Sequence, residues 1–437
     1  MKKTIAIALA LAVSAGAFAQ KEASKSLDNI KSNVKVYGFV RNYYAFDTRE
    51  CVAGTEDFFN YIPKDNNWSV REDLNAIPSL RYSALTSRIG LDISGYEIGG
   101  MKVGGKIETD FYCGVSGVTG TAQLRLRQAF LTLAKGDWNL KAGQAWHPLA
   151  ADLADVVSLN TGSPFGPFSR TPQVLFEYSV AKPLSFSIGA IWQQQYCSAG
   201  PDGASANYIK YSCVPEMYLA ANYKQGGLLV RVGADMLSIK PRNYGTNDAG
   251  KKIKVSDRLT TLSPYIYLQY KGSNYTLKAK SIFAESGEHM NLNGGYGISE
   301  KHADGCYSYT PTRNSSSWLT FIYGKKLQGS IFLGYVRNFG TKDPLYEDLT
   351  GGYSSSLYFS KNSFANMNRM WRTSPTVIYN FGPKLSMALE LEITGVQYGE
   401  FHVVDGKQYV PASNGLCTDR LHWVNNYRVQ GMMKFSF

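Results

Sequence analysis

The stretch "YRVQGMMKFSF" (residues 427–437) separates into two faces when alternate positions are read together. One phase is apolar and aromatic, and it holds Tyr427, Val429, Gly431, Met433, Phe435 and Phe437. The other phase holds Arg428, Gln430, Met432, Lys434 and Ser436. Successive side chains of a strand point to opposite faces of its sheet, so the pattern predicts a strand with one apolar face. Soluble chains usually fray into solvent at the C-terminus, whereas here we expect the last aromatic residue to lie within a sheet.

The same alternation recurs along the chain. It is clearest in "RIGLDISG" (88–95), "VGGKIETDF" (103–111), "LSFSIGAIW" (184–192) and "LSMALELEITG" (385–395). Segments of about ten alternating residues between turn signals are typical of a membrane-spanning β-barrel. A soluble sandwich shows the same period, so the connections between the segments have to distinguish the two folds.

The connections alternate between short and long. Short links such as "AKGD" (134–137) and "KQGG" (224–227) alternate with long links, here 147–172 and 241–257. Short turns at one end and long loops at the other are the pattern of an outer-membrane barrel. We therefore predict an all-β, transmembrane antiparallel β-barrel of about sixteen strands. The predicted strands are 34–47, 83–96, 102–113, 122–134, 138–146, 173–181, 184–197, 210–223, 228–240, 259–271, 275–285, 316–324, 329–338, 370–381, 385–397 and 421–437.

The N-terminal segment predicts export. "MKKTIAIALALAVSAGAFAQ" carries two lysines, a short apolar run and an A-x-A site at residues 17–19, which is the pattern of a signal peptide. We expect residues 1–19 to be a cleaved signal peptide, 20–33 a short periplasmic segment and 34–437 the barrel. The expected location is the outer membrane of a Gram-negative bacterium, with the outer face of the barrel in contact with lipid.

Composition fits this prediction. The chain has 30 Tyr, 21 Phe, 7 Trp and 42 Gly with only 18% charged residues, which suits β-structure with many turns. After the signal peptide we find no apolar run of about 18 residues, the length that a spanning helix needs. The formal net charge is +12, and removal of Lys2 and Lys3 leaves 12 − 2 = +10. Such an excess suits anionic solutes or an anionic membrane surface, and export makes nucleic acid an unlikely partner.

Residues 103–174 carry a family resemblance in "VGGKIETDFY", "LRLRQAFLTL", "NLKAGQAWHPLAADL" and "RTPQV". These stretches resemble the trimeric outer-membrane porins of the DcaP type. The resemblance implies a homotrimer of sixteen-stranded barrels that passes small, preferably anionic, solutes. Residues 20–33 are too few for a stable isolated helix, so we expect the barrel walls to hold the trimer. The terminal Phe437 also resembles the C-terminal signal that the outer-membrane insertion machinery reads.

The third long connection, "HPLAADLADVVSLNTGSPFGPFSR" (147–170), is unusually apolar for a surface loop. A sixteen-stranded barrel is wide enough to leave an aqueous channel, and long loops are often functional. We expect this loop to fold inward and narrow the channel. The candidate lining residues are Arg88, Lys106, Glu108, Asp110, Arg125, Arg127, Lys141, Asp152 and Asp155.

Two interpretations of the charged candidates remain open. In the first, a cluster of basic side chains on adjacent strands raises the local concentration of anions; its members are Arg88, Lys106, Arg125 and Arg127. A sharper form of this interpretation is a transverse field between Arg88, Arg125 and Arg127 on the wall and Asp152 and Asp155 on the loop. In the second, the basic residues pair with acidic neighbours on the wall and stiffen it. These neighbours are Asp92, Glu108, Asp110 and Glu177. Both interpretations can hold together.

Six cysteines fall in long loops or at the strand ends beside them: Cys51, Cys113, Cys197, Cys213, Cys306 and Cys417. An even count in an exported chain favours disulfides. We expect Cys197–Cys213 within one loop and Cys51–Cys113 between neighbouring loops, which leaves Cys306–Cys417. The spacing of His289, His302 and Cys306 matches no zinc motif, and we predict no metal and no cofactor.

We find no G-x-S-x-G, H-E-x-x-H or phosphate-binding glycine motif. Glu390 and Glu392 lie two residues apart on one strand face, which suits pore lining better than acid–base catalysis. We therefore predict a porin for passive diffusion of small hydrophilic, preferably anionic, solutes, and not an enzyme. The alternatives are a sugar-specific porin, with Tyr265 and Tyr267 on the inward face, or a surface adhesin or structural barrel.

Overall fold

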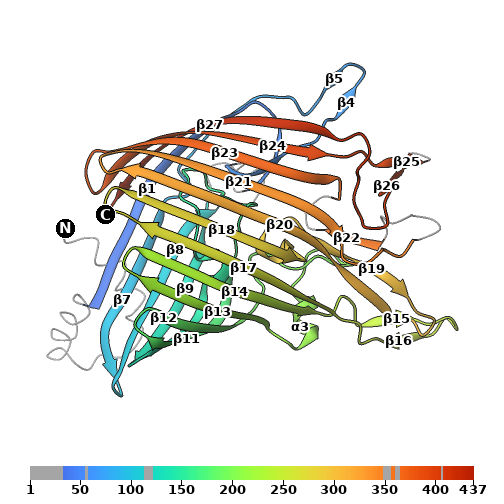
Figure 1. Ribbon diagram of the computed structural model, residues 1–437, viewed down its shortest axis with the longest axis horizontal. Helices are drawn as coiled ribbons and strands as arrows, with labels where there is room; N and C mark the ends of the chain where they lie inside the picture. Colours follow the sequence, from blue (N-terminus) through green and yellow to red (C-terminus); the bar gives the residue numbers. More distant parts are fainter. Residues whose placement is uncertain (1–32, 55–57, 113–121, 348–355, 360–364, 405–406) are drawn as a thin grey trace.

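The computed structural model describes residues 33–54, 58–112, 122–347, 356–359, 365–404 and 407–437. The predicted signal peptide and nearly all of the predicted segment 20–33 lie outside these residues, as does Cys113. The described residues form a closed antiparallel barrel whose strands run obliquely to its axis (Figure 1).

Sixteen barrel strands follow one another around the wall within the described residues, as the alternation predicts. They are β1 (Val34–Asp47), β7 (Arg88–Ile98), β8 (Met101–Tyr112), β9 (Gln123–Lys135), β10 (Trp138–Trp146), β11 (Arg170–Ala181), β12 (Leu184–Ile191), β13 (Glu216–Gln225), β14 (Leu228–Ile239), β17 (Leu259–Lys271), β18 (Tyr275–Glu285), β20 (Tyr307–Gly324), β21 (Leu327–Thr341), β23 (Met367–Asn380), β24 (Leu385–Tyr398) and β27 (His422–Ser436). A short strand, β6 (Ser79–Ser83), precedes β7, and both pair with β1, so the second wall strand is interrupted between them.

The last strand closes the barrel against the first. β27 pairs with β1 in antiparallel register, with Ser436 opposite Phe39 and Arg428 opposite Asp47. Arg428 and Asp47 are buried on the inner face, where two guanidinium nitrogens bond the two carboxylate oxygens at 2.8 Å each. A closed sheet leaves no unpaired backbone edge in the bilayer, which a spanning structure requires.

The two faces of each strand differ as the sequence predicts. On β27, the outward Tyr427, Val429 and Phe435 are 40–49% exposed, whereas the inward Arg428 is fully buried. An outer belt of exposed apolar side chains around polar inner walls suits lipid outside and water within. The described residues include no helix that is long and apolar enough to cross a membrane.

Smaller elements cluster with the long loops (Figure 1). The strand pairs are β2 (Cys51–Gly54) with β3 (Phe59–Pro63), β4 (Trp68–Ser69) with β5 (Glu72–Asp73), β15 (Tyr244–Thr246) with β16 (Lys252–Lys254), and β25 (His402–Val404) with β26 (Lys407–Tyr409). β19 (Gly295–Lys301) pairs with β20 and with β22 (Leu357–Phe359). The helical turns are η1 (Pro148–Ala150), α3 (Asn207–Ser212) and η2 (Gly287–Met290).

The predicted strand 210–223 is wrong at its start. Residues 207–212 form α3, and the strand β13 begins only at Glu216. Tyr208 and Ile209 of α3 pack into a buried cluster with Leu237 and Leu259 of the wall. Burial of these two side chains therefore outweighs the strand propensity of the segment.

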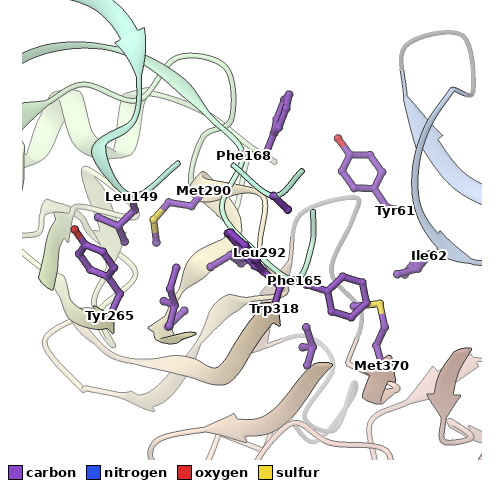
Figure 2. Close-up of a cluster of buried hydrophobic side chains, with 14 of the residues drawn as sticks. Tyr61, Ile62, Leu149, Phe165, Phe168, Tyr265, Met290, Leu292, Trp318 and Met370 are labelled. Atoms are coloured by element: carbon purple, nitrogen blue, oxygen red, sulfur yellow. The ribbon is translucent and has the colours of Figure 1, made fainter. Parts of the chain in front are cut away.

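The third long loop folds into the lumen, as predicted. Leu149, Phe165 and Phe168 of this loop join a buried cluster with Tyr265 and Trp318 of the wall (Figure 2). Phe165 is completely buried, and burial of a side chain of this size contributes about 1.5–3 kcal/mol relative to exposure. The first long loop also enters the lumen, since every residue of β3 is buried.

The predicted disulfides are not formed by the described cysteines. Cys51, Cys197, Cys213, Cys306 and Cys417 are all free. Cys213 ends α3 in a left-handed conformation (φ 56°), and its sulfur contacts the carbonyl oxygen of Lys210 at 3.7 Å. The sulfur of Cys197 contacts the carbonyl oxygen of Gln194 at 3.9 Å. Each of these two thiols therefore faces its own segment, and the predicted Cys197–Cys213 bridge is wrong.

The predicted Cys306–Cys417 bridge also fails, whereas the predicted Cys51–Cys113 bridge includes a residue outside the described part of the chain. Cys417 is buried in an apolar cluster with Ala365 and Val410, whereas Cys306 lies in the turn between β19 and β20 and donates its backbone N–H to Asp304. The predicted Cys306–Cys417 bridge is therefore wrong. Cys51 is free, with its sulfur 3.5 Å from the carbonyl oxygen of Arg49.

Candidate channel constriction

The middle of the inward loop is anchored to carboxylates of β24. The backbone N–H groups of Val157 and Ser158 donate to the Glu390 carboxylate at 2.7 and 3.1 Å. Asn160 donates to Glu392 at 2.8 Å. Glu390 and Glu392 thus satisfy polar groups that the loop brings into the lumen, as buried backbone donors require. This placement fits neither an acid–base pair nor a freely exposed lining.

The end of the loop is held by an arginine of β23. Arg372 is buried, donates to the carbonyl oxygen of Ser163 at 2.9 Å and donates to that of Tyr61 at 2.6 Å. One guanidinium therefore joins the third loop to β3 of the first loop. Phe165 lies over this group, with the guanidinium carbon 5.0 Å from its ring centre.

The two acidic residues of the loop pair with basic residues of another part of the wall. Asp152 accepts from Arg231 of β14 at 2.5 Å, and Asp155 accepts from Lys278 of β18 at 2.7 Å. Lys280 of β18 donates to the carbonyl oxygens of Leu149 and Asp152. Neither aspartate lines the cavity that the arginines border. The structure therefore does not bring Asp152 and Asp155 opposite Arg88, Arg125 and Arg127, as the transverse field requires.

A cavity of about 500 Å³ lies between the inward loop and the wall formed by β1, β7, β8 and β9. Five arginines line it: Arg41, Arg88, Arg125, Arg127 and Arg170. On the loop side the lining is mostly apolar and includes Leu153, Val156 and Leu159. We call the five arginine side chains the arginine wall.

Three members of the arginine wall pair with two carboxylates of β8. Arg125 holds both oxygens of Asp110 at 2.8 Å each, and Arg127 bonds Glu108 at 2.9 Å and Asp110 at 2.5 Å. Arg88 lies 3.3 Å from Glu108. Glu108 and Asp110 therefore follow the second interpretation, in which the basic residues pair with acidic neighbours on the wall.

The other two members have no carboxylate partner among the described residues. Arg41 donates to Thr86 at 3.2 Å and lies against the rings of Phe39 and Tyr43. Arg170 donates to the side chain of Gln195, and its Nη1 has no hydrogen-bond partner. Five guanidinium groups and two carboxylates give 5 − 2 = +3 at the cavity.

Sequence reasoning missed Arg41 and Arg170. Arg41 occupies the inward phase of the first predicted strand, which was a usable signal, because Tyr43 and Asp47 share its face. Arg170 is the first residue of β11, and only the path of the preceding loop brings it to the cavity.

The remaining candidates lie elsewhere on the inner wall. Lys106 pairs with Asp92 at 2.8 Å and also donates to Tyr37. Lys141 lies over the ring of Phe130, and the cavity lining does not include it.

Neutral groups complete the rim of the cavity. The hydroxyls of Tyr61 and Tyr196 are 2.6 Å apart and join the first loop to the segment after β12. Burial raises the pKa of Tyr196 above its usual value, so its phenol stays protonated at neutral pH and adds no negative charge.

A closed barrel with an apolar belt, a polar lumen and an inward loop that narrows it is the architecture of an outer-membrane porin. The family described as DcaP outer membrane protein matches residues 3–191 of the chain, which confirms the resemblance to DcaP-type porins and the location in the outer membrane.

Solved structures share this fold over almost the whole chain. The outer membrane channel DcaP of Acinetobacter baumannii matches with a TM-score of 0.64 and 19% identity, over 92% of this chain and 97% of that one. An anion-selective porin from Comamonas acidovorans matches with a TM-score of 0.52 and 10% identity, over 92% and 99%. OmpT of Vibrio cholerae, folded in vitro, matches with a TM-score of 0.50 and 13% identity, over 92% and 97%. No curated protein matches the chain.

Proposed function

We propose that this porin lets small hydrophilic anions diffuse passively through its lumen, and that the arginine wall sets the preference for anions. The observation that carries the proposal is the net charge of +3 around a cavity of about 500 Å³ beside the inward loop. Clustered basic side chains in a narrow passage raise the local concentration of anions.

The chemistry of the arginine wall favours carboxylate and phosphate groups. A guanidinium presents a planar fork of donors that matches two oxygens of such a group. Because Arg41 and Arg170 bond only neutral oxygens among the described residues, they are the members best placed to exchange these bonds for a passing anion. The Comamonas acidovorans porin of the same fold is described as anion-selective, and the arginine wall supplies a physical basis for the same preference here.

We also propose that the protein works as a homotrimer in outer-membrane lipid, with contacts through the barrel walls. The wide outer belt of exposed apolar residues supports contact with both lipid and neighbouring barrels. The alternating face of β27, which runs to an outward Phe435, supports recognition by the insertion machinery.

The reversal potential of the purified protein in planar bilayers under a KCl gradient tests the proposal. We expect a sign that reports chloride as the more permeant ion, and block of chloride current by dicarboxylates or phosphate. A cation-selective reversal potential, or block by neutral oligosaccharides alone, contradicts it.

The sugar-specific alternative is less well supported by the inner wall. Its candidate stacking residues, Tyr265 and Tyr267, are only 4% and 1% exposed. Tyr265 bonds the hydroxyl of Tyr218, and Tyr267 packs against Trp318 beneath the inward loop. Rings covered in this way are not free to stack on a passing sugar. An adhesin with a blocked lumen is separated by conductance, because a porin conducts in single-channel steps.

A further inference from the structure

A second polar cluster lies buried inside the barrel, apart from the arginine wall. It consists of His147, Glu216, Asp235 and His289, each at most 2% exposed. His147 precedes η1 at the start of the inward loop, Glu216 begins β13, Asp235 lies on β14 and His289 lies on η2. The β13–β14 hairpin therefore meets two segments far from it in the sequence, those of His147 and His289, and none of the four residues lines the arginine cavity.

The nitrogen and oxygen atoms of the cluster lie at distances suited to metal binding. His289 Nε2 is 3.3 Å from Glu216 Oε1 and 3.8 Å from Asp235 Oδ2. Ligand atoms of His147, Glu216 and Asp235 all lie within 4.8 Å of one another. A tetrahedral zinc ion with bonds of about 2.0–2.2 Å keeps its ligand atoms roughly 3.4 Å apart. Small side-chain adjustments would bring these atoms into one coordination sphere.

Hydrogen bonds assign different tautomers to the two histidines. The backbone N–H of Leu149 donates to His147 Nδ1 at 3.2 Å, so the neutral ring carries its proton on Nε2 and donates it to Glu216 Oε1 at 2.6 Å. His289 Nδ1 lies 2.9 Å from the carbonyl oxygen of Ser286 and donates to it, so in the neutral ring Nε2 carries a lone pair that points toward Glu216 and Asp235. A histidine that binds a metal through one ring nitrogen usually donates the N–H of the other nitrogen to a carbonyl or carboxylate oxygen, which fixes the orientation of the ring.

Three acceptor atoms of the cluster are left without a partner. His289 Nε2, Glu216 Oε2 and Asp235 Oδ1 are buried and make no hydrogen bond. Buried polar atoms are nearly always paired, and two buried carboxylates facing a lone pair repel one another unless a cation lies between them. The charge of the two carboxylates, −2, equals the charge that one divalent ion would neutralise. The adjacent Glu288 uses Oε1 to accept from the backbone of Ala199 and is left out of the ligand set.

We propose that this cluster binds a divalent transition-metal ion of the zinc class through His289 Nε2, Glu216 and Asp235, with His147 as the residue that orients Glu216. Imidazole and carboxylate ligands together suit zinc and its neighbours, whereas Mg²⁺ and Ca²⁺ prefer oxygen ligands alone. The bound ion would join β13, β14 and η2, and His147 would connect the start of the inward loop to the site through its hydrogen bond to Glu216. The proposal is independent of the solute that the channel passes.

Titration of the folded, chelator-treated protein in detergent with Co²⁺ tests this site. Visible d–d absorption reports ligation, and Zn²⁺ should displace the Co²⁺. We expect saturation at one ion per chain. His289→Gln and Asp235→Asn should abolish the signal, and His147→Gln should weaken affinity about 10–100-fold, as loss of an orienting residue does.

His302→Gln is the matched control, because His302 bonds Ser308 in the turn between β19 and β20 and should leave binding unchanged. If the ligand variants do not fold, the wild-type titration decides. Absence of stoichiometric Co²⁺ and Zn²⁺ binding by folded wild-type protein overturns the proposal and leaves a proton on His289 as the balancing charge. Equal binding by folded His289→Gln and Asp235→Asn also overturns it.

Discussion

Replacement of Arg41 and Arg170 by Gln should lower anion selectivity without opening the barrel wall. Both arginines line the cavity beside the inward loop. Among the described side chains, Arg41 donates to Thr86 and Arg170 donates to Gln195, and both of these acceptors are neutral. The double variant changes the local charge from +3 to 3 − 2 = +1, and it leaves Glu108 and Asp110 with their own arginine partners.

The size of the effect follows from Coulomb's law. An ion that passes about 6 Å from a guanidinium in water gains about 0.7 kcal/mol, which screening at 0.1 M salt reduces to about 0.4 kcal/mol. Two charges therefore contribute about 0.8 kcal/mol, or roughly a fourfold change in local anion concentration and the opposite change for cations. The chloride-to-potassium permeability ratio should fall by roughly an order of magnitude.

Reversal potentials of wild type and variant in the same KCl gradient measure this ratio. Lys141→Gln is the control, because Lys141 lies on the inner wall but outside the cavity lining. The reasoning fails if the double variant retains the wild-type ratio, or if Lys141→Gln reduces the ratio as much as the double variant does.

Three further predictions concern the loop, the closing seam and the thiols. Glu390→Ala removes the acceptor of two loop N–H groups and should increase single-channel conductance; an unchanged conductance would show that the loop holds without it. Arg428→Ala removes the bidentate partner of the buried Asp47 at the seam between β1 and β27 but leaves Arg81 and Asn426 bonded to that carboxylate. It should therefore cost about 1–3 kcal/mol, measured as a lower unfolding temperature of the barrel on gels; a wild-type temperature argues against this role. Burial raises the pKa of Cys417 to about 12, so little thiolate forms at pH 8, and maleimide should label Cys417 far more slowly than the exposed Cys213. Labelling of Cys417 should accelerate as the pH rises toward that pKa, and equal rates at pH 8 would contradict the assignment.

The barrel was predictable from sequence because its determinants are local. Alternation with a period of two, as in residues 427–437, marks the face of each strand without knowledge of its neighbours. The apolar composition of residues 147–170 likewise predicts the inward fold, since Phe165 and Leu149 are buried against apolar side chains of the wall inside the barrel. The start of β13 was missed, because burial of Tyr208 and Ile209 against other strands decides the conformation of α3.

The partners of charged groups were not predictable, since they depend on contacts between distant segments. Asp152 pairs with Arg231, 79 positions away, rather than with the arginines of β7 and β9. In the sequence, His289 is close only to His302 and Cys306 among the candidate metal ligands. In the structure, its Nε2 lies 3.3 Å from Glu216 and 3.8 Å from Asp235. Rules based on sequence spacing detect metal ligands that lie on one turn or one helix. They do not detect residues that come close in space only because a closed sheet brings distant segments together.

The anchoring of the inward loop also bears on the order of biogenesis. Val157 and Ser158 lie 233 and 232 positions before their acceptor Glu390 in the chain. The inward loop therefore cannot be anchored until β24 has joined the wall, and we expect the width of the channel to be fixed only at that stage of insertion. Protease protection of the loop, followed during insertion, should rise with β24 and not with β10; earlier protection would refute this order.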